Sequence, residues 1–446
     1  MSTKVEGVIV ITRNGDRIVY QQDPETYKGG PSDTTPLGEA QSHALGSLLR
    51  ETYLKPNSPS YVAGMSPDVV NTKEVKVFAK AGGEGTVVFD STIALLQGLF
   101  PPTLKNKIRL ANGQEIVAPL GGYQYVPVET VEPSNDRRLE SWTNCPKFAE
   151  HVKKVGSSDE FKDVEKKAKP FFDLVKDYVF GRQLSLHNIW NIYDFVSTQY
   201  MYNQTYAYRL PPTVEPTARS LANWHEDKIF SDEKMDGIGN IAGRTLLRTI
   251  LASLERIAFN GDPLQLMIVD TTYQPFISLF HMTNATTGNS GKPLHGIPDF
   301  ASALAIELRR GPPPDMRDFL RFKFRNGTGD FETVHVLGTK SDIPLTEFIY
   351  KTQHAQVINN KHWKEVCNGK SLLDMDALSS IDPQRSADMG LGVLGAVIAL
   401  LLVLGIVTAA KHRRANRKRV QLLGEEQQML GRQDATFGSA EKVRYV

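Results

Sequence analysis

Two arginines and an amide follow the first apolar run of the chain. Residues 8–11 (VIVI) are short, β-branched and uncharged, which favours a buried parallel strand. After a single threonine come Arg13, Asn14, Gly15, Asp16 and Arg17. Ligands of α/β sheets bind at the carboxyl ends of the strands, so this position suits a binding site. Two guanidiniums around a glycine turn could bind one phosphate group. An ordinary surface loop that contains two arginines is the alternative interpretation of this spacing.

Alternating strand and helix patterns around a helical block predict the elements that hold this segment. Strand-like runs occur at residues 75–79, 264–269, 276–280, 303–308 and 333–337, and helical spacing occurs at 37–53 and 89–99. Long amphipathic runs fill the middle of the chain, from about residue 148 to 259. This order predicts an α/β fold in which a parallel-type core sheet is flanked by helices and interrupted by an inserted helical lobe.

An uncharged run over residues 389–410 is long enough to cross about 30 Å of hydrocarbon as one transmembrane helix. The segment KHRRANRKR follows it, so the positive-inside rule predicts a cytoplasmic tail and a lumenal or extracellular N-terminal part. Fixing this topology is the common role of such a cluster, and contact with anionic lipid is a second one. No signal peptide is visible near Met1, and we expect a leader upstream of it. A tail-anchored protein that faces the cytosol is the alternative.

These features divide the chain into predicted parts. The α/β core takes residues 1–147 and 260–373, and the helical insert takes 148–259. A stalk (374–388), the transmembrane helix (389–410) and a basic cytoplasmic tail (411–446) follow. The formal net charge is only +2, from 52 basic and 50 acidic residues, which gives no reason to expect a nucleic-acid partner. We expect no metal and no cofactor, because the sequence has no Cys/His cluster, no HExxH motif and no complete phosphate-binding loop.

The segment 13–17 (RNGDR) is similar to the Arg-His-Gly-x-Arg signature of the histidine acid phosphatases, which have the phosphoglycerate-mutase-like fold. The similarity continues through the helix at 37–53, the segment LLQGLFPP at 95–102, and PDFASALAIEL at 298–308. It spans about residues 5–370. The resemblance implies the family's core sheet with flanking helices and a helical insert.

In that family the motif histidine attacks phosphorus and three arginines hold the phosphoryl oxygens. The resemblance puts Arg13 and Arg17 at two of the arginine positions and Asn14 at the nucleophile position. The segment 63–68 (AGMSPD) places Met65, or a neighbour of it, at the third arginine. An amide nitrogen is delocalised into its carbonyl, so Asn14 cannot accept a phosphoryl group as imidazole does.

A His-Asp pair late in the chain completes the family's site, and its aspartic acid protonates the leaving group. The matching segment here is a predicted strand that ends at His281, with Met282 at the acid position. A thioether has no proton to give. The resemblance thus implies a pseudophosphatase with lost or strongly reduced activity, in which Arg13, Arg17 and His281 form a cleft for phosphate or a phosphomonoester.

Two alternatives stay open. One is an active acid phosphatase with a non-standard nucleophile or acid, such as Asp16 or Asp299. The other is a surface binding or scaffold protein.

The resemblance also implies a disulfide, because the family has a bridge between positions similar to Cys145 and Cys367. Such a bond would fit an oxidising compartment, and two buried thiols are the alternative. Three Asn-x-Thr sequences begin at Asn203, Asn284 and Asn326, all ahead of the apolar run, and make these residues candidates for glycosylation. About as many would occur by chance in a chain of this composition, so they support export only weakly.

Overall fold

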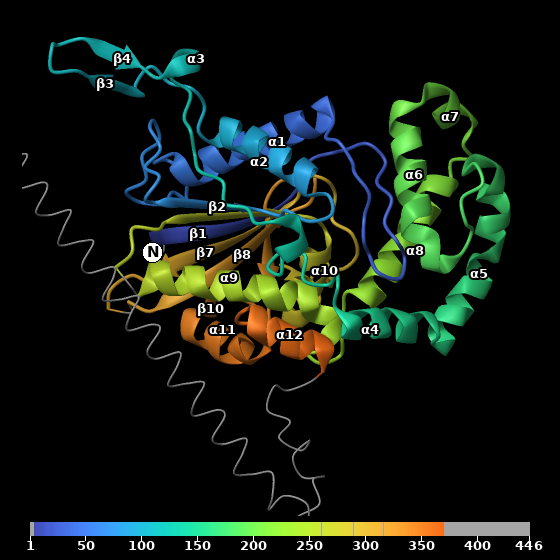
Figure 1. Ribbon diagram of the computed structural model, residues 1–446. Helices are drawn as coiled ribbons and strands as arrows, with labels where there is room; N and C mark the ends of the chain where they lie inside the picture. Colours follow the sequence, from blue (N-terminus) through green and yellow to red (C-terminus); the bar gives the residue numbers. More distant parts are fainter. Residues whose placement is uncertain (1–3, 260, 289, 315, 370–446) are drawn as a thin grey trace, which may run out of the picture. The chain divides into compact units, whose positions relative to one another are not determined.

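The computed structural model describes residues 4–259, 261–288, 290–314 and 316–369. They form a sheet that helices cover on both faces, with a lobe of further helices beside it (Figure 1). The predicted stalk, transmembrane helix and tail lie outside the described residues, as do the last residues of the predicted core. Within the described part of the chain, none of the helices has the length and apolar character that a membrane span requires.

The main sheet has the strand order β2-β5-β1-β7-β8-β9-β6, and β10 pairs with β8. Its strands are β1 (Lys4–Arg13), β2 (Val75–Ala79), β5 (Leu266–Thr271), β6 (Thr286–Thr287), β7 (Ala303–Arg310), β8 (Asp318–Arg325), β9 (Glu332–His335) and β10 (Ile343–Pro344). Strands β2, β5 and β1 are parallel, whereas β1 pairs with β7 in the antiparallel sense, as do the later neighbours. The predicted parallel sheet is therefore mixed, because short connections join β7, β8 and β9 and force antiparallel pairing.

Strand β1 is central and is buried along nearly its whole length. Its side chains alternate between the two faces of the sheet: Val8 and Val10 belong to one apolar cluster, Ile9 and Ile11 to another. Since both clusters lie under helices, both faces of the strand must be apolar, which explains the uninterrupted run of aliphatic residues.

Two pairs of helices cover these faces (Figure 1). Helices α1 (Pro36–Leu49) and α2 (Gly85–Leu99) pack on one face, and α9 (Ile241–Ala258) and α10 (Gln274–Thr283) on the other. A Cβ atom at Gly46 would lie 1.9 Å from the carbonyl oxygen of Leu95, so glycine is required where α1 crosses α2. The side chain of Thr35 accepts from the backbone N–H of Gly38 and caps α1 next to the segment 13–17.

The lobe consists of α4 (Pro146–Gly156), α5 (Asp159–Val175), α6 (Ile189–Tyr202), α7 (Gln204–Arg209) and α8 (Val214–Ile229). The predicted insert 148–259 takes in nearly all of these helices and also α9, which covers the sheet. The remaining strands and α-helices of the described residues are a small hairpin of β3 (Lys107–Arg109) and β4 (Glu115–Val117) with α3 (Pro119–Gly122), and the helices α11 (Leu345–Thr352) and α12 (Asn360–Asn368). The predicted disulfide between Cys145 and Cys367 is confirmed, and it joins the start of α4 to α12.

The strand predicted at residues 276–280 is wrong, because these residues lie within α10. Pro275 stands in the first turn of this helix, where proline is favourable, and Asn284 ends it in the left-handed conformation. Nearly all side chains of α10 are buried. A helix that is buried on all sides has no polar stripe, so its sequence is easily taken for a buried strand.

Candidate functional site

The segment Arg13 to Arg17 lies at the carboxyl end of β1, as the sequence predicts. Arg13 is in register with Thr271 at the end of β5, and the backbone N–H of Asn14 donates to the carbonyl of Thr271 at 3.1 Å. From the other side, the N–H of Ala301 donates to the carbonyl of Asn14 at 3.0 Å. The turn is thus held between the end of β5 and the segment ahead of β7.

Arg17 is buried, with 1% of its surface exposed. Its guanidinium forms ion pairs with Glu84, just ahead of α2, and with Asp194 of α6, the latter at 2.8 Å. Burial alone would lower the pKa of Arg17, but the two carboxylates outweigh it and raise that pKa. The charge of Arg17 is therefore compensated by the protein itself, and this contact joins the lobe to the core.

Arg13 is also buried, and its guanidinium donates to the backbone carbonyl of Pro298. The ring of Phe300 lies 4.1 Å from this guanidinium and 5.6 Å from that of Arg17. Burial lowers the pKa of Arg13. The Pro298 carbonyl thus lies beside Arg13, and the Phe300 ring lies beside both arginines. Both groups take up space where phosphate oxygens would have to contact the guanidiniums.

Asn14 is 1% exposed. Its side-chain amide donates to the carbonyl of Gly15 at 2.9 Å, and its Oδ1 has no hydrogen-bond partner among the described residues. A Cβ atom at Gly15 would lie 2.1 Å from the carbonyl oxygen of Gly38, so the turn packs closely on the start of α1. Asn14 is consequently a buried turn residue.

A cavity of about 390 Å³, which we call the first-strand cavity, opens beside Arg13 between the sheet and the lobe. Aromatic side chains of the lobe, including Trp190 and Tyr193, line part of it. Its charged lining residues are Arg13, Arg219, Asp16, Asp194, Glu215 and Asp299. Four carboxylates thus face two guanidiniums, and a lining with this balance disfavours a multiply charged anion.

His281, Met282 and Met65 are not among the residues that line the first-strand cavity. His281 is exposed on the last turn of α10, and the Met282 thioether packs against Gly243 of α9. Met65 is buried in the apolar cluster that contains Val5, near the amino end of β1. The predicted cleft of Arg13, Arg17 and His281 is therefore corrected to the two arginines without the histidine. Residue 281 lies away from the end of β5 because α10 is a helix.

Two ionisable residues at the same edge of the sheet were missed by the sequence analysis. Asp270 stands in β5 opposite Thr12, and Lys80 follows β2 directly and donates its N–H to the carbonyl of Asp270 at 3.0 Å. Asp270 is 1% exposed, and burial raises its pKa to about 7. The Lys80 Nζ atom lies 3.2 Å from a carboxylate oxygen of Glu140.

The sequence could have indicated these residues by their position, since each is an ionisable residue at the end of an apolar strand pattern. The side chain of Asp270 faces α2, where Thr92 lies 2.9 Å from its Oδ2 atom. Neither Asp270 nor Lys80 lines the first-strand cavity.

Comparison with known proteins gives full-length relatives. The chain is 25% identical over 416 residues to lysosomal acid phosphatase of Homo sapiens, with 89% of this chain and 86% of the relative covered. It is 26% identical over 417 residues to lysosomal acid phosphatase of Rattus norvegicus, with the same coverage. No family model matches the chain.

Solved structures agree in fold. Klebsiella sp. ASR1 phytase matches with a TM-score of 0.55 at 10% identity, over 81% of this chain and 97% of the phytase. Hafnia alvei phytase in complex with myo-inositol hexakis sulphate matches with a TM-score of 0.54 at 11% identity, over 80% and 98%. The fold, the loop after β1 and the relatives that cover most of the chain all support the resemblance to the histidine acid phosphatase family.

Proposed function

We propose that the protein is a membrane-anchored member of the family whose phosphomonoesterase activity is lost or strongly reduced. One observation carries the proposal: the residue at the nucleophile position is the buried amide of Asn14, whose nitrogen is a donor to Gly15. Covalent phosphoryl transfer needs a lone pair at that position, and an amide nitrogen has none to offer.

The surroundings of the two arginines support the same conclusion. Arg17 is engaged by Glu84 and Asp194, and Arg13 by the carbonyl of Pro298 and the ring of Phe300. Arg13 and Phe300 both line the first-strand cavity, and the ring lies against the guanidinium, so it restricts the contact of a phosphate group with Arg13. We therefore propose that phosphate or a phosphomonoester binds there weakly, through Arg13.

One observation favours residual acid catalysis as a second candidate. A carboxyl group whose pKa is about 7 keeps its proton at acidic pH, and Asp270 is such a group at the edge of the sheet next to Arg13. Its side chain faces Thr92 of α2, however, and does not line the first-strand cavity. We keep the inactive protein as the principal proposal.

The test is hydrolysis of para-nitrophenyl phosphate at acidic pH by the purified full-length chain. We expect turnover close to the uncatalysed rate, and no change on Arg13→Ala. Turnover at ordinary enzyme rates, abolished by Arg13→Ala, would contradict the proposal. Asn14→His, which returns an imidazole to the nucleophile position, should raise turnover only slightly while Phe300 and the carboxylates remain.

Membrane anchoring through residues 389–410, with the N-terminal part lumenal or extracellular, belongs to the same proposal. The disulfide supports an oxidising compartment for that part. Protease treatment of sealed membrane vesicles should remove the tail from the cytoplasmic side and spare residues 4–369. Digestion of residues 4–369 with retention of the tail would contradict this topology.

Glycosylation of the exported part is also proposed. Asn203, Asn284 and Asn326 are all exposed. Asn326 is the least suited of the three, because its amide donates to Asp299 and its Oδ1 accepts from the N–H of Asp299 and the hydroxyl of Ser302. Glycosidase treatment should shift the mobility of the chain, and Asn284→Gln should remove part of that shift. A chain without any glycosidase-sensitive shift would contradict this part of the proposal.

A further inference from the structure

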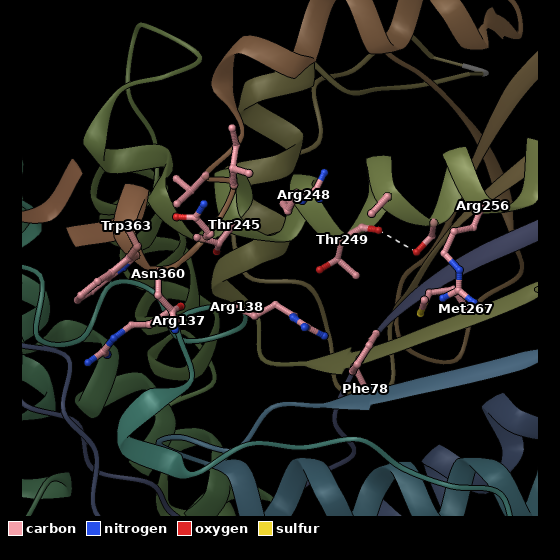
Figure 2. A pocket seen from close by; sticks show the side chains of 15 residues that line it. Phe78, Arg137, Arg138, Thr245, Arg248, Thr249, Arg256, Met267, Asn360 and Trp363 are labelled. Carbon is pink, nitrogen blue, oxygen red and sulfur yellow. Dashed lines mark hydrogen bonds between the residues drawn. The ribbon is translucent and has the colours of Figure 1, made fainter. Parts of the chain in front are cut away.

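A second cavity, of about 340 Å³, lies on the side of the sheet that α9 covers (Figure 2). Phe78 of β2 and Met267 of β5 form its base, and α9 forms one wall. The loop that holds Arg137 and the segment from residue 357 to Trp363 complete it. We call it the arginine cavity. It has no lining residue in common with the first-strand cavity.

The charge of the arginine cavity has one sign. Its lining contains four arginines, namely Arg137, Arg138, Arg248 and Arg256, and no aspartate or glutamate. The first-strand cavity has twice as many carboxylates as guanidiniums, so the two cavities have opposite character. Like charges that line one hollow repel one another, and a bound anion reduces this repulsion.

Two of the four arginines have guanidinium groups that already interact with other residues of the protein. Arg256 forms two hydrogen bonds with Asp262, at 2.8 and 2.9 Å. Arg137 lies 4.2 Å from the ring of Trp363 and donates to the carbonyl of Thr143 at 3.4 Å.

The other two guanidiniums are available. Arg138 lies 4.1 Å from the ring of Phe78, and within the described residues it has no hydrogen bond or ion pair. Arg248 is half-buried on α9 and likewise has neither among the residues that the structure describes. Because an arginine presents five N–H donors, these two side chains offer a set of donors that the protein leaves unused.

The wall formed by α9 is polar along one stripe. Thr245, Arg248, Thr249, Ser253 and Arg256 recur at helical spacing, so they lie on one face of the helix. The opposite face of α9 is apolar and buried, as expected for a helix on a sheet. The hydroxyls of Thr245 and Ser253 already form hydrogen bonds within the protein, so the arginines are the groups on this face that suit oxyanion recognition (Figure 2).

We propose that the arginine cavity binds a small polyanion that carries at least two phosphate- or carboxylate-type groups, with Arg138 and Arg248 as its main ligands. The volume lies at the lower end of the range for ligand cavities, about 300–1,000 Å³, which favours a small molecule. The several guanidiniums favour more than one anionic group. This binding is independent of catalysis at the first-strand cavity.

The probe for the test is pyrophosphate, which is titrated into the full-length chain and followed by calorimetry. Inorganic phosphate, which has only one anionic group, is the comparison. We expect pyrophosphate to bind more tightly than phosphate and to weaken as the salt concentration rises. Arg138→Gln and Arg248→Gln should each weaken pyrophosphate binding about tenfold or more, because each removes a charge-assisted contact. Arg209→Gln, at an exposed arginine on α7, is the matched control and should leave the affinity unchanged.

Neither Arg138→Gln nor Arg248→Gln leaves a carboxylate without its partner, so both variants should fold, and circular dichroism checks this. No binding of pyrophosphate, or equal affinity in both variants and the unchanged chain, overturns the proposal. If Arg219→Gln abolishes binding instead, the anion occupies the first-strand cavity and the proposal is equally overturned. Turnover of para-nitrophenyl phosphate is measured separately, so the two proposals can fail independently.

Discussion

The ring of Phe300 lies 4.1 Å from the guanidinium of Arg13, at the carboxyl end of the central strand. The same ring is 5.6 Å from Arg17, so one phenyl group contacts both cations of the loop. An aromatic face attracts a cation without neutralising it. Together with Glu84 and Asp194, which pair with Arg17, this contact stabilises two arginines close together at this edge of the sheet.

Replacing Phe300 should expose more of the Arg13 guanidinium to the first-strand cavity, which Arg13 already lines. We expect Phe300→Ala to tighten binding of inorganic phosphate by up to about tenfold, which is the scale of one cation–aromatic contact. Isothermal titration calorimetry on the two chains measures the difference. Phe180→Ala, at a phenylalanine that is 70% exposed on the lobe, should leave phosphate binding unaltered. An unchanged affinity in Phe300→Ala would mean that the ring does not obstruct the arginine.

The position of the loop was predictable because its causes are local. An apolar β-branched run buries itself as a strand, and the polar residues after it must then lie at the strand's end. For the same reason Asp270 and Lys80 could have been found, since each marks the end of a strand pattern. The disulfide between Cys145 and Cys367 was predicted from the family resemblance.

The partners of the loop could not be predicted, because they come from distant segments. Asp194 approaches Arg17 from the lobe, and Phe300 approaches Arg13 from the loop ahead of β7. No local sequence pattern predicts these long-range contacts, which depend on how the lobe packs against the sheet. His281 was misplaced for a different reason: nearly all of α10 is buried, so its largely apolar sequence does not distinguish a helix from a strand.

Asp270 should make the stability of the fold depend on pH. Burial raises its pKa to about 7 from an ordinary 3.8, so the folded state keeps a proton that the unfolded state releases. Its contribution is fully present below about pH 4 and is lost as the pH rises to about 7. A shift of about 3 units corresponds to about 4 kcal/mol of unfolding free energy.

Asp270→Asn removes this titration. We therefore expect the variant to gain stability relative to the unchanged chain as the pH rises from 4 to 7, by about 4 kcal/mol at most. Urea unfolding of both chains across this range measures the difference between them. Asp177→Asn, at an exposed carboxylate, is the control and should run parallel to the unchanged chain. A constant difference between Asp270→Asn and the unchanged chain at all pH values would show that Asp270 does not titrate in this range.

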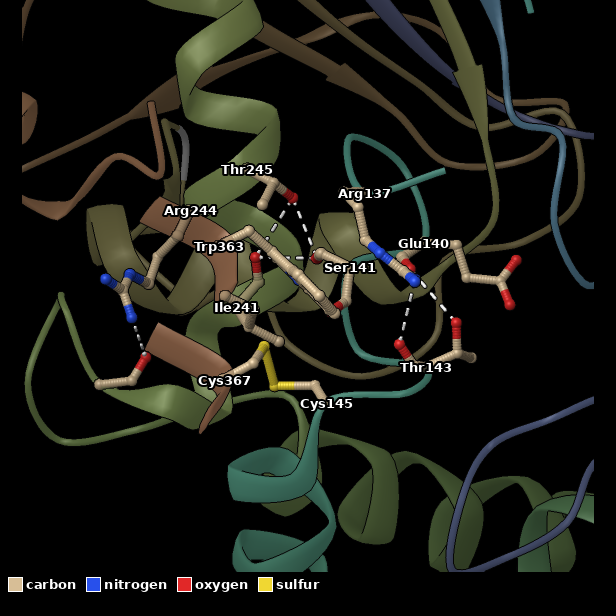
Figure 3. Close-up of a disulfide and its surroundings, with 11 residues drawn as sticks. Arg137, Glu140, Ser141, Thr143, Cys145, Ile241, Arg244, Thr245, Trp363 and Cys367 are labelled. Atoms are coloured by element: carbon tan, nitrogen blue, oxygen red, sulfur yellow. Dashed lines mark hydrogen bonds between the residues drawn. A yellow bond between two sulfur atoms is a disulfide. The ribbon is translucent and has the colours of Figure 1, made fainter. Parts of the chain in front are cut away.

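The disulfide closes a loop of 222 residues and connects the first lobe helix to α12 (Figure 3). Constraining so long a loop in the unfolded chain stabilises the fold by about 2–5 kcal/mol. The variant with both Cys145→Ala and Cys367→Ala should lose that amount in urea unfolding. Adding a reductant should weaken the unchanged chain similarly and leave the double variant unaffected. Equal stability of the two chains under oxidising conditions would mean that the bond contributes nothing to the fold.

The buried ion pair of Arg17 with Asp194 should matter far more than the half-exposed pair of Arg219 with Asp299. Asp194→Ala leaves the Arg17 charge with Glu84 alone and removes the acceptor of the Tyr20 N–H, which lies 2.8 Å from Asp194 Oδ2. Loss of one partner from a buried pair costs about 3–5 kcal/mol.

Asp194→Asn keeps an oxygen for the Tyr20 N–H, so we expect it to lose less stability than Asp194→Ala. Asp299→Asn, in a pair whose side chains are 34% and 41% exposed, should cost no more than about 1 kcal/mol. Urea unfolding of the three variants gives the comparison. Since Asp194 belongs to α6 and Arg17 follows β1, Asp194→Ala should also loosen the lobe, seen as faster amide exchange in α6 than in α2. If Asp194→Ala and Asp299→Asn cost the same, the contact between lobe and core does not depend on the Arg17 pair.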